Sequence, residues 1–522
     1  MWRGQRSRTA VVGAAMAAFF VCCVLPIAYL LPTTLSGADA SGIGLDGRQR
    51  GLLYNTALLG VGTALLATAI GAPLGAALAR VPIRRKPVIR IIVAAPLVLP
   101  PYVAALAWIY LGSSRGVVAT LAGRDLLSEW TYSLPAAIVV LSLVLYPLSM
   151  LATEVAMRRI DPRLEEAGLM VAPPGRVLWR ISLPLALPSI LAAALIIFVL
   201  AVSEFGVPGL LRVRVYTTEV FTAFAALYDF SRAIILAVPL LLLSTVVAAS
   251  AAVLLGDRLV APRRSLGGLP LVLEGSRRPA EVVFVLAAVT AVGLPVLILG
   301  REALAARSIP AIAFGSFSAI ANSLVFSATG ATMVVALAVW LGYAHARAGH
   351  AFRLGGQVLF VVLFAIPSTI LGVGLILLWN RPGPLGALYG TEVMFVLAYL
   401  ARFAPVAVLI LAAATQTVSV SQEEAAAVSG AGWFRTMRRI VLPQIRLGIA
   451  GAWVVTFVLA FGELGVSILV APPGEATLPI RIYTIIANAP ASHVAALVLL
   501  QSLVIFTPLV VLGSVAARVE VR

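Results

Sequence analysis

The chain alternates between long apolar segments and short polar ones. A helix needs about 20 apolar residues to cross the hydrocarbon core of a bilayer. Twelve segments are long enough, at residues 10–31, 53–79, 89–111, 133–156, 185–205, 233–256, 281–299, 320–345, 356–380, 391–415, 446–470 and 495–517. The pattern therefore predicts an all-α polytopic membrane protein with about twelve transmembrane helices.

Composition supports this prediction, and the placement of charge refines it. Hydrophobic residues make up 61% of the chain and charged residues 11%, whereas soluble domains are about 45–50% apolar. A net charge of +17 would suit nucleic acid if the basic residues shared one surface. They instead favour every second loop, as the positive-inside rule describes for cytoplasmic loops. We expect contact with the lipid bilayer, no nucleic-acid partner, and both termini in the cytoplasm.

The N-terminal segment has a competing interpretation as a cleaved signal. Ala38-Asp39-Ala40 resembles a signal-peptidase site, but the apolar run before it is about 22 residues, longer than the roughly 7–15 of a signal-peptide core. Cleavage would also leave the first half one span short of the second. We expect this segment to remain as a span.

The chain is internally duplicated. Residues 55–80 match residues 322–347 at an offset of 267, and Pro100 matches Pro367 at the same offset. Further along, an offset of 259 relates the halves, so the first half carries eight extra residues, which we place in the loop 112–132. Six spans per half give repeats of the same orientation, hence a parallel repeat. We expect a first half at 1–257, a cytoplasmic linker at 258–280 and a second half at 281–522.

One polar loop occurs in both halves, at about 158–184 and 416–445. The first contains EEAGLMVAPPGRVLWRISLP and the second EAAAVSGAGWFRTMRRIVLP. Each is expected to begin as a short helix, capped by Asp161 with Pro162 in the first copy and by a Ser421–Glu424 capping box in the second. Breaks are expected at Pro173-Pro174-Gly175 and at Gly430 and Gly432. A plain interfacial anchor is the alternative, but two matched copies disfavour it.

These loops resemble the E-A-A, three residues, Gly, nine residues, Ile-x-Leu-Pro signature of permease subunits in bacterial binding-protein-dependent ABC importers. The second copy fits throughout, whereas the first has Glu166 at the first alanine and Val171 at the glycine. The resemblance implies the type I importer permease fold, an inner-membrane location, and coupling loops seated on an ATPase. It assigns ATPase coupling to Glu165, Ala167, Gly175, Ile181, Leu183, Pro184, Glu424, Ala425, Ala426, Gly430, Ile440, Leu442 and Pro443.

The chain has no ATP-binding motif of its own. A P-loop needs Gly-Lys-Ser/Thr, and the only lysine is Lys86, which Pro87 follows. We expect a transport subunit that is not an enzyme and holds no cofactor. ATP and Mg would be bound by a partner dimer of ABC ATPase subunits, and a periplasmic or lipid-anchored binding protein would deliver the solute.

The solute is the least constrained property. Fusion of two six-span permeases resembles the ferric-iron importers, with LPPYVAALAWIYL at 99–111, SEFGVPGLL at 203–211 and GELGVSILVAPPG at 462–474. Thiamine and aminoalkylphosphonate importers share this layout. An ATPase-independent secondary transporter with parallel repeats is the alternative class.

Four polar residues are candidates for the translocation pathway. Glu204 and Glu463 each lie 20 residues past a Leu-Pro, about 30 Å along a helix. Ionisable groups at membrane depth usually face a cavity, and a carboxylate pair would suit a hard cation. Capping of neighbouring backbone is the alternative role. Asn55 and Asn322 are expected to satisfy backbone groups between helices. The histidines His345, His350 and His493 are too dispersed for a metal site, and no catalytic set stands out.

Overall fold

The computed structural model describes residues 2–30, 47–255, 273, 277–383 and 386–520. These residues form helices and loops and contain no strand. Ten helices are long and apolar enough to cross a membrane, or up to twelve if each of two sharply bent pairs is one span. The prediction of an all-α protein with about twelve spans is confirmed, and each predicted segment has a helical counterpart.

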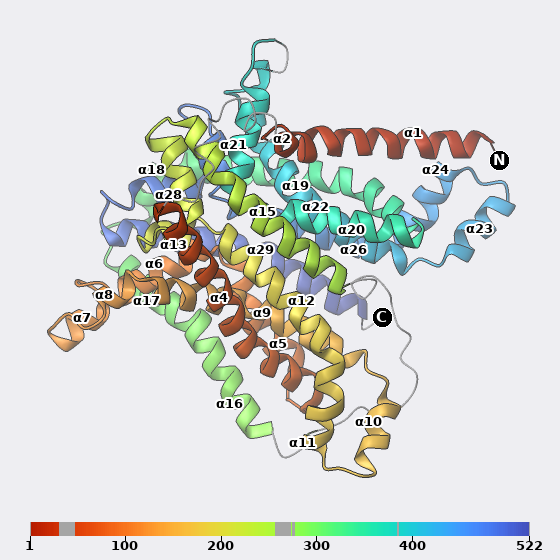
Figure 1. The fold of residues 1–522 in the computed structure, drawn as a ribbon, viewed down its shortest axis with the longest axis horizontal. Helices are drawn as coiled ribbons and strands as arrows, with labels where there is room; N and C mark the ends of the chain where they lie inside the picture. Colours follow the sequence, from red (N-terminus) through yellow and green to blue (C-terminus); the bar gives the residue numbers. More distant parts are fainter. Residues whose placement is uncertain (1, 31–46, 256–272, 274–276, 384–385, 521–522) are drawn as a thin grey trace.

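The first half begins with two helices joined by a π turn and continues through the spans seen in Figure 1. Its helices are α1 (Trp2–Phe19), α2 (Leu25–Ala28), α4 (Gly47–Arg80), α5 (Lys86–Ala94), α6 (Pro101–Gly112), α7 (Val117–Ala122), α8 (Ser128–Thr131), α9 (Leu134–Arg158), α10 (Pro162–Leu169), α11 (Pro174–Val177), α12 (Leu183–Ser203), α13 (Gly206–Leu210), α14 (Tyr216–Phe221) and α15 (Phe230–Leu255).

The second half repeats this order. Its helices are α16 (Arg277–Ala288), α17 (Leu294–Leu304), α18 (Ile309–Gly315), α19 (Phe317–Ala346), α20 (His350–Ala365), α21 (Ser368–Trp379), α22 (Val393–Gln416), α23 (Val420–Val428), α24 (Trp433–Thr436), α25 (Leu442–Gln444), α26 (Arg446–Phe461), α27 (Ser467–Val470), α28 (Leu478–Ile485) and α29 (Ala491–Glu520). Most of the predicted linker, residues 258–280, lies outside the described residues. Helix α16 begins at Arg277, three residues before the predicted end of that linker.

A tight helix trio forms the centre of each half. Helix α12 packs on α4 and α9, and α26 packs on α19 and α22 in the same way. Glycines allow the close approach within these trios. A Cβ at Gly342 would lie 2.9 Å from the Leu411 Cβ of α22, and one at Gly75 would meet the backbone of Met150 in α9. Small residues at such contacts bring helix backbones together, which is how membrane helices associate.

The first helices of each half pack against the opposite half. Helix α1 contacts α19 and α24, while α16 contacts α4 and α5 and α17 contacts α6. The Arg8 guanidinium of α1 lies 5.7 Å from the ring centroid of Tyr343 in α19. Each half therefore contributes its first helices to the surface of the other half.

The halves differ in one loop by the length that the repeat predicts. Residues 113–133 separate α6 from α9, whereas residues 380–392 separate α21 from α22. The first loop is longer by eight residues, and it forms the hairpin with α7 and α8 that projects from the bundle (Figure 1). The predicted position of the insertion is therefore confirmed.

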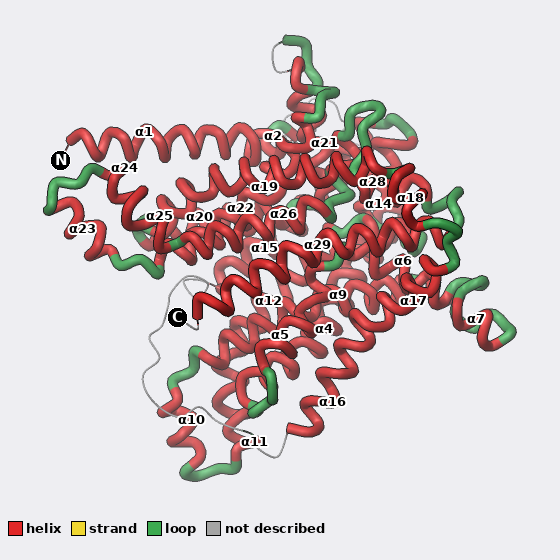
Figure 2. Tube along the Cα trace, turned by 180° about the vertical axis from the view of Figure 1, so that it is seen from behind, coloured by secondary structure: helices red, strands yellow, loops and turns green. Residues whose placement is uncertain are grey.

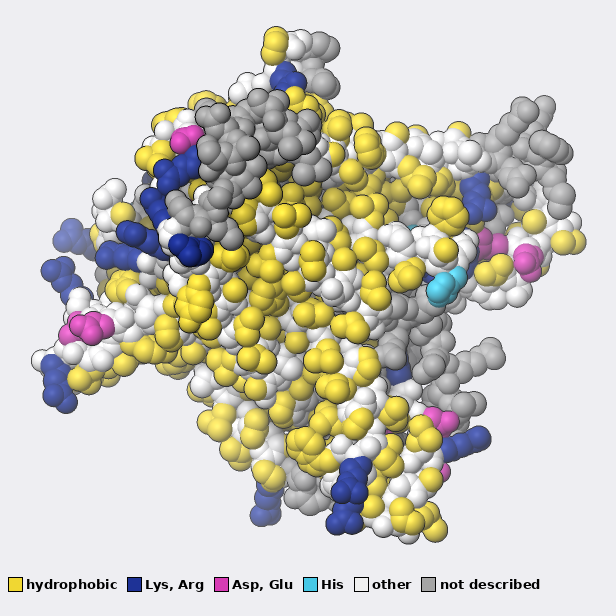
Figure 3. All heavy atoms as spheres, viewed as in Figure 1, with side chains coloured by type: hydrophobic (Ala, Val, Ile, Leu, Met, Phe, Trp, Pro, Cys, Tyr) yellow, Lys and Arg dark blue, Asp and Glu magenta, His cyan; other side chains and the backbone are white. Residues whose placement is uncertain are grey.

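The surface matches a chain that lies in lipid. Hydrophobic side chains cover the middle of the face shown in Figure 3, and arginine and lysine side chains gather toward its edges. Large apolar side chains such as Leu65, Val246 and Leu297 are exposed along long helices. Such a broad exposed apolar band is typical of a surface that lipid covers.

Candidate functional site

Both repeated polar loops fold as a helix, a break and a second helix, and they project from the same side of the molecule (Figure 2). In the first loop, the Asp161 carboxylate accepts the backbone N–H of Arg163 at 3.1 Å, with Pro162 at the start of α10. The extended backbone of Pro173 separates α10 from α11. This loop begins and breaks where the sequence predicts.

The second loop breaks at Gly430, whose backbone has a left-handed conformation that favours glycine. Gly430 has φ of 78°, and the N–H of Ala431 donates to the Ala426 carbonyl at 2.9 Å, as in a Schellman helix end. The predicted capping box is wrong. Helix α23 starts at Val420 after Ser419, so Ser421 and Glu424 lie inside the helix, and Ser419 makes no side-chain cap.

A buried ion pair fastens the first loop to the bundle. The Arg80 guanidinium at the end of α4 donates to the Glu165 carboxylate from Nη2 at 2.8 Å and from Nε at 3.1 Å. The Ser182 hydroxyl donates to the same oxygen at 2.6 Å, and Arg80 also donates to the Met157 carbonyl. The Arg80 and Glu165 side chains are only 2% and 1% exposed.

An equivalent but more open pair fastens the second loop. Arg347, at the end of α19, donates from Nε to the Glu423 carboxylate at 2.9 Å and from Nη2 to the Val418 carbonyl at 2.9 Å. The Tyr343 hydroxyl donates to the other Glu423 oxygen at 2.7 Å. The Arg347 and Glu423 side chains are 12% and 15% exposed.

These contacts correct the sequence alignment of the loops by one residue. Arg80 and Arg347 are equivalent at the offset of 267, so the spatial counterpart of Glu165 is Glu423 and not Glu424. We call the Arg80–Glu165 and Arg347–Glu423 pairs the loop struts. The residue that follows each strut glutamate is exposed, and it is Glu166 in α10 and Glu424 in α23.

The corrected alignment explains the departure of the first loop from the motif. Ala167 and Gly168 now align with Ala425 and Ala426, and the first loop has one residue fewer in its break, where it has no counterpart of Gly430. When the two loops are aligned only by their terminal Leu-Pro, the one-residue deletion in the first loop is not visible. The adjacent glutamates in both loops were the signal that could have shown it.

The Leu-Pro positions do not start new helices. A π turn at Leu178–Ser182 leads directly into Leu183 and Pro184, and α11 to α12 forms one apolar helix. A second π turn, Met437–Val441, precedes Leu442 and Pro443. There the helix bends by 71° before Arg446. The wider π turn accommodates a proline that has no N–H to donate. Ile181 and Ile440 lie within these turns, and Gly175 lies in α11.

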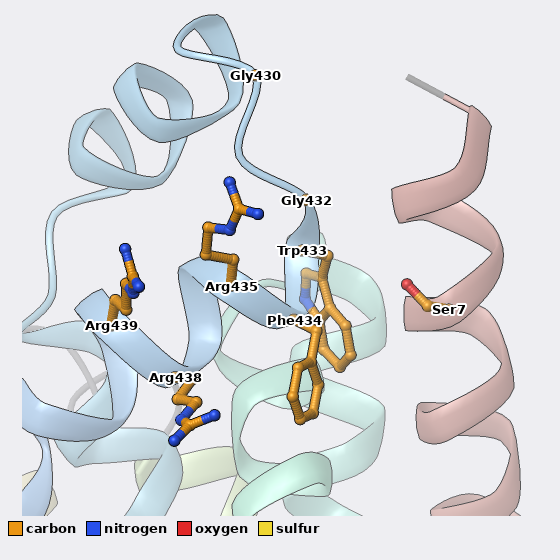
Figure 4. A pocket seen from close by; sticks show the side chains of 8 residues that line it. All are labelled: Ser7, Gly430, Gly432, Trp433, Phe434, Arg435, Arg438 and Arg439. Carbon is orange, nitrogen blue, oxygen red and sulfur yellow. The ribbon is translucent and has the colours of Figure 1, made fainter.

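A cavity of about 630 Å³ lies beside the second loop. In Figure 4, Ser7 of α1 lies across from the aromatic rings of α24, and the three arginines lie on the side of these rings away from α1. The lining residues of the cavity are Ser7, Gly430, Gly432, Trp433, Phe434, Arg435, Arg438 and Arg439. The second loop therefore presents a basic, partly aromatic surface.

Glu204 directly follows α12, Glu463 lies two residues after the end of the equivalent helix α26, and each carboxylate caps backbone that follows it. The Glu204 carboxylate accepts the N–H of Gly206 at 2.9 Å, and the Glu463 carboxylate accepts the N–H of Val466 at 3.0 Å. A Cβ added at Gly206 would lie 3.1 Å from the Glu204 Oε1 and 3.8 Å from the Leu464 Cδ2, so the segments that carry the two glutamates approach each other where the halves meet. Each glutamate therefore caps local backbone and also lies where the two halves meet.

Arg402 completes this central cluster and was missed in the sequence. Its side chain is buried in α22, and it donates to a carbonyl next to the one that accepts from Ser203, the residue before Glu204. It donates from Nη1 to the Phe364 carbonyl at 3.0 Å and to the Ile366 carbonyl. It is the only charged residue between 393 and 416, which was the available signal.

Asn55 and Asn322 lie in the first turns of the paired long helices α4 and α19. The Asn55 amide donates to the Arg214 carbonyl at 3.1 Å. The Asn322 amide donates to the Glu475 carboxylate at 2.6 Å and to the Ala476 carbonyl. Both asparagines tie their helices to the segment that follows the central carboxylate. Within the described ranges, no group of three His, Cys, Asp or Glu could hold a metal ion.

A duplicated bundle of membrane-spanning helices, with a strutted helical loop in each half, defines a membrane transport permease. The family model for the inner membrane component of binding-protein-dependent transport systems matches residues 71–258 and again residues 335–521. The chain belongs to this family, whose members are ABC importer permeases of the inner membrane.

Individual relatives carry different substrates in their names. The Fe(3+)-transport system permease protein FbpB 2 of Haemophilus influenzae is 24% identical over 443 residues, covering 84% of each chain. The spermidine/putrescine transport system permease protein PotC of Escherichia coli is 30% identical over 197 residues, which is 37% of this chain and 70% of that protein. PhnV of Salmonella paratyphi A, named for 2-aminoethylphosphonate transport, is 25% identical over 171 residues, or 33% of this chain and 63% of that protein.

Proposed function

We propose that this chain is the whole transmembrane permease of an ATP-driven importer, with the solute pathway between its two halves. The observation that carries the proposal is the pair of polar loops, each fastened by an Arg–Glu strut to the end of a long helix. A rigid strut transmits a push on the loop to the helix, which a loose anchor does not. Two such loops suit a dimer of ATPase subunits, which would bind ATP and Mg on the cytoplasmic face beside both termini.

We propose ferric iron as the solute, delivered by a periplasmic or lipid-anchored binding protein. A ferric-iron permease matches over 84% of each chain, and the central Glu204–Glu463 pair suits a hard cation because carboxylate oxygens are hard ligands. Spermidine is also a cation and is the next alternative. An aminoalkylphosphonate carries a negative phosphonate group that two carboxylates would repel, and thiamine shares only the layout.

Coupling is tested at Gly430, with Gly432 as its matched control. A Cβ meets open space at both positions, but only Gly430 has a positive φ, where an alanine costs roughly 1–2 kcal/mol. Gly430→Ala is expected to lower solute-stimulated ATP hydrolysis of the reconstituted importer, while Gly432→Ala leaves it near wild type. Equal activity of both variants would argue against a role of this break in coupling.

The solute is tested by uptake into vesicles that contain the permease, its ATPase and its binding protein. Labelled ferric iron is expected to enter with ATP inside, in preference to spermidine, 2-aminoethylphosphonate and thiamine. Glu204→Gln with Glu463→Gln is expected to lower that uptake. Uptake without the ATPase subunits would instead indicate a secondary transporter, and preference for another solute would overturn the iron proposal alone.

A further inference from the structure

The formal charges at the centre of the molecule do not balance. When all three groups are ionised, Glu204 and Glu463 contribute two negative charges and Arg402 one positive charge, which gives a net charge of −1. Among the described residues, no ion pair joins Arg402 to either carboxylate. A buried charge without close compensation is unfavourable. Binding of a cation between the carboxylates, or movement of Arg402 towards them, would compensate it.

Arg402 is held by backbone instead. Phe364, Ala365 and Ile366 end α20, where the chain turns by 94° into α21. Arg402 donates to the first and third of their carbonyls, and the Ser203 hydroxyl donates to the second at 3.0 Å. Ser203 directly precedes Glu204. One helix break thus holds both the arginine and the end of the helix that carries a carboxylate.

The arginine also has unused hydrogen-bonding capacity. The Arg402 side chain is only 7% exposed, and its buried Nε has no hydrogen-bond partner among the described residues. A guanidinium offers five donors in a planar fork that matches a carboxylate. An unsatisfied buried donor is costly in this conformation, and pairing with a carboxylate would satisfy it.

The position is specific to the second half. The residue that corresponds to Arg402 is Leu143 at the offset of 259 and Val144 at the offset of 258 that Glu165 and Glu423 give, and neither is charged. One arginine therefore serves a pair of carboxylates that come from both halves. A central site shared by both halves has room for a single counter-ion, and an arginine in only one half supplies it.

We infer that Arg402 is a tethered counter-cation: the α20 carbonyls hold it in this conformation, and it bridges Glu204 and Glu463 in the conformation of the transport cycle that releases a cationic solute. The inference rests on the proposed function, a permease whose pathway carries a cation. The arriving solute displaces the guanidinium to its carbonyl anchors, and its return helps to release the solute. Arg402 therefore acts on specificity and release by competing for the carboxylates.

Charge balance gives a test that does not depend on the identity of the solute. Arg402→Gln leaves a net charge of −2, whereas Arg402→Gln combined with Glu463→Gln restores −1. The single variant is expected to lower the melting temperature and to reduce ATP hydrolysis of the reconstituted importer by about tenfold, because a buried charge loses its partner. The double variant is expected to recover both to within about threefold of wild type. Its cation uptake should stay low, since half of the site is missing.

The control is Arg124→Gln, which removes an exposed arginine from the loop between α7 and α8 and should change neither quantity. If Arg402 only anchors the α20 carbonyls, the second substitution cannot compensate, and a double variant no better than the single one would overturn the inference. Failure of ATP-dependent uptake would instead count against the proposed function, because the melting temperatures still report the charge coupling.

Discussion

At the scale of single residues, the two loop struts share a design but differ in their surroundings. The Arg80–Glu165 pair is nearly inaccessible, while the Arg347–Glu423 pair keeps some contact with solvent. Removing one partner of a buried pair leaves an uncompensated charge and costs about 3–5 kcal/mol. Pairs with access to water contribute much less. The first loop is therefore the more rigidly attached of the two.

This difference predicts unequal effects of matched substitutions. Arg80→Gln is expected to destabilise the protein by about 3–5 kcal/mol, and Arg347→Gln by clearly less. Thermal unfolding of the purified protein in detergent measures both. Arg80→Gln with Glu165→Gln should recover part of the loss, since no buried charge remains. Equal destabilisation by the two single variants would show that burial does not separate the struts.

At the scale of elements, the halves meet where helices end close to the central cluster. A Cβ at Gly462, after α26, would lie 2.7 Å from the Pro100 Cγ that precedes α6. A Cβ at Gly465 would collide with Ser368, the first residue of α21. These glycines allow helix ends from different parts of the chain to share a small volume.

The contact across the halves predicts that Gly462→Ala is harmful. Overpacking of a tight contact costs about 1–3 kcal/mol, and the displaced element here is the start of α6. We expect lower thermal stability and reduced ATP-coupled uptake. Gly451→Ala in α26 is the matched control, because a Cβ there meets nothing within 4 Å. A harmless Gly462→Ala would mean that the two helix ends can separate freely.

At the scale of the whole molecule, the exchange of first helices joins the halves. Helix α1 covers α19 and α24 of the second half, and α17 packs on α6 of the first. Each half alone would expose the apolar surface that the other covers.

We therefore expect residues 1–257 and 277–522, produced as two chains in one cell, to purify together as a complex. Each chain produced alone is expected to be unstable in detergent, as judged by aggregation in size-exclusion chromatography. Omitting residues 1–30 from the first chain should weaken the complex. Stable, separate halves would contradict the role of the exchanged helices.

Sequence by itself determined the number of spans, the duplication and the position of the polar loops. Long apolar runs can satisfy their backbone in lipid only as helices, so their count and order survive any packing. The eight-residue insertion followed from offsets alone, because chain length does not depend on tertiary contacts.

Only the tertiary structure decided which residues meet. It replaced Glu424 by Glu423 as the counterpart of Glu165, because the partner arginines lie about 80 residues away in the chain. It also brought Arg402 and Ser203, the residue before Glu204, to adjacent carbonyls at the end of α20. Periodicity reports which face of a helix is apolar, but not which neighbour that face contacts. The central charge cluster arises from packing between the halves, and local sequence carries no record of that packing.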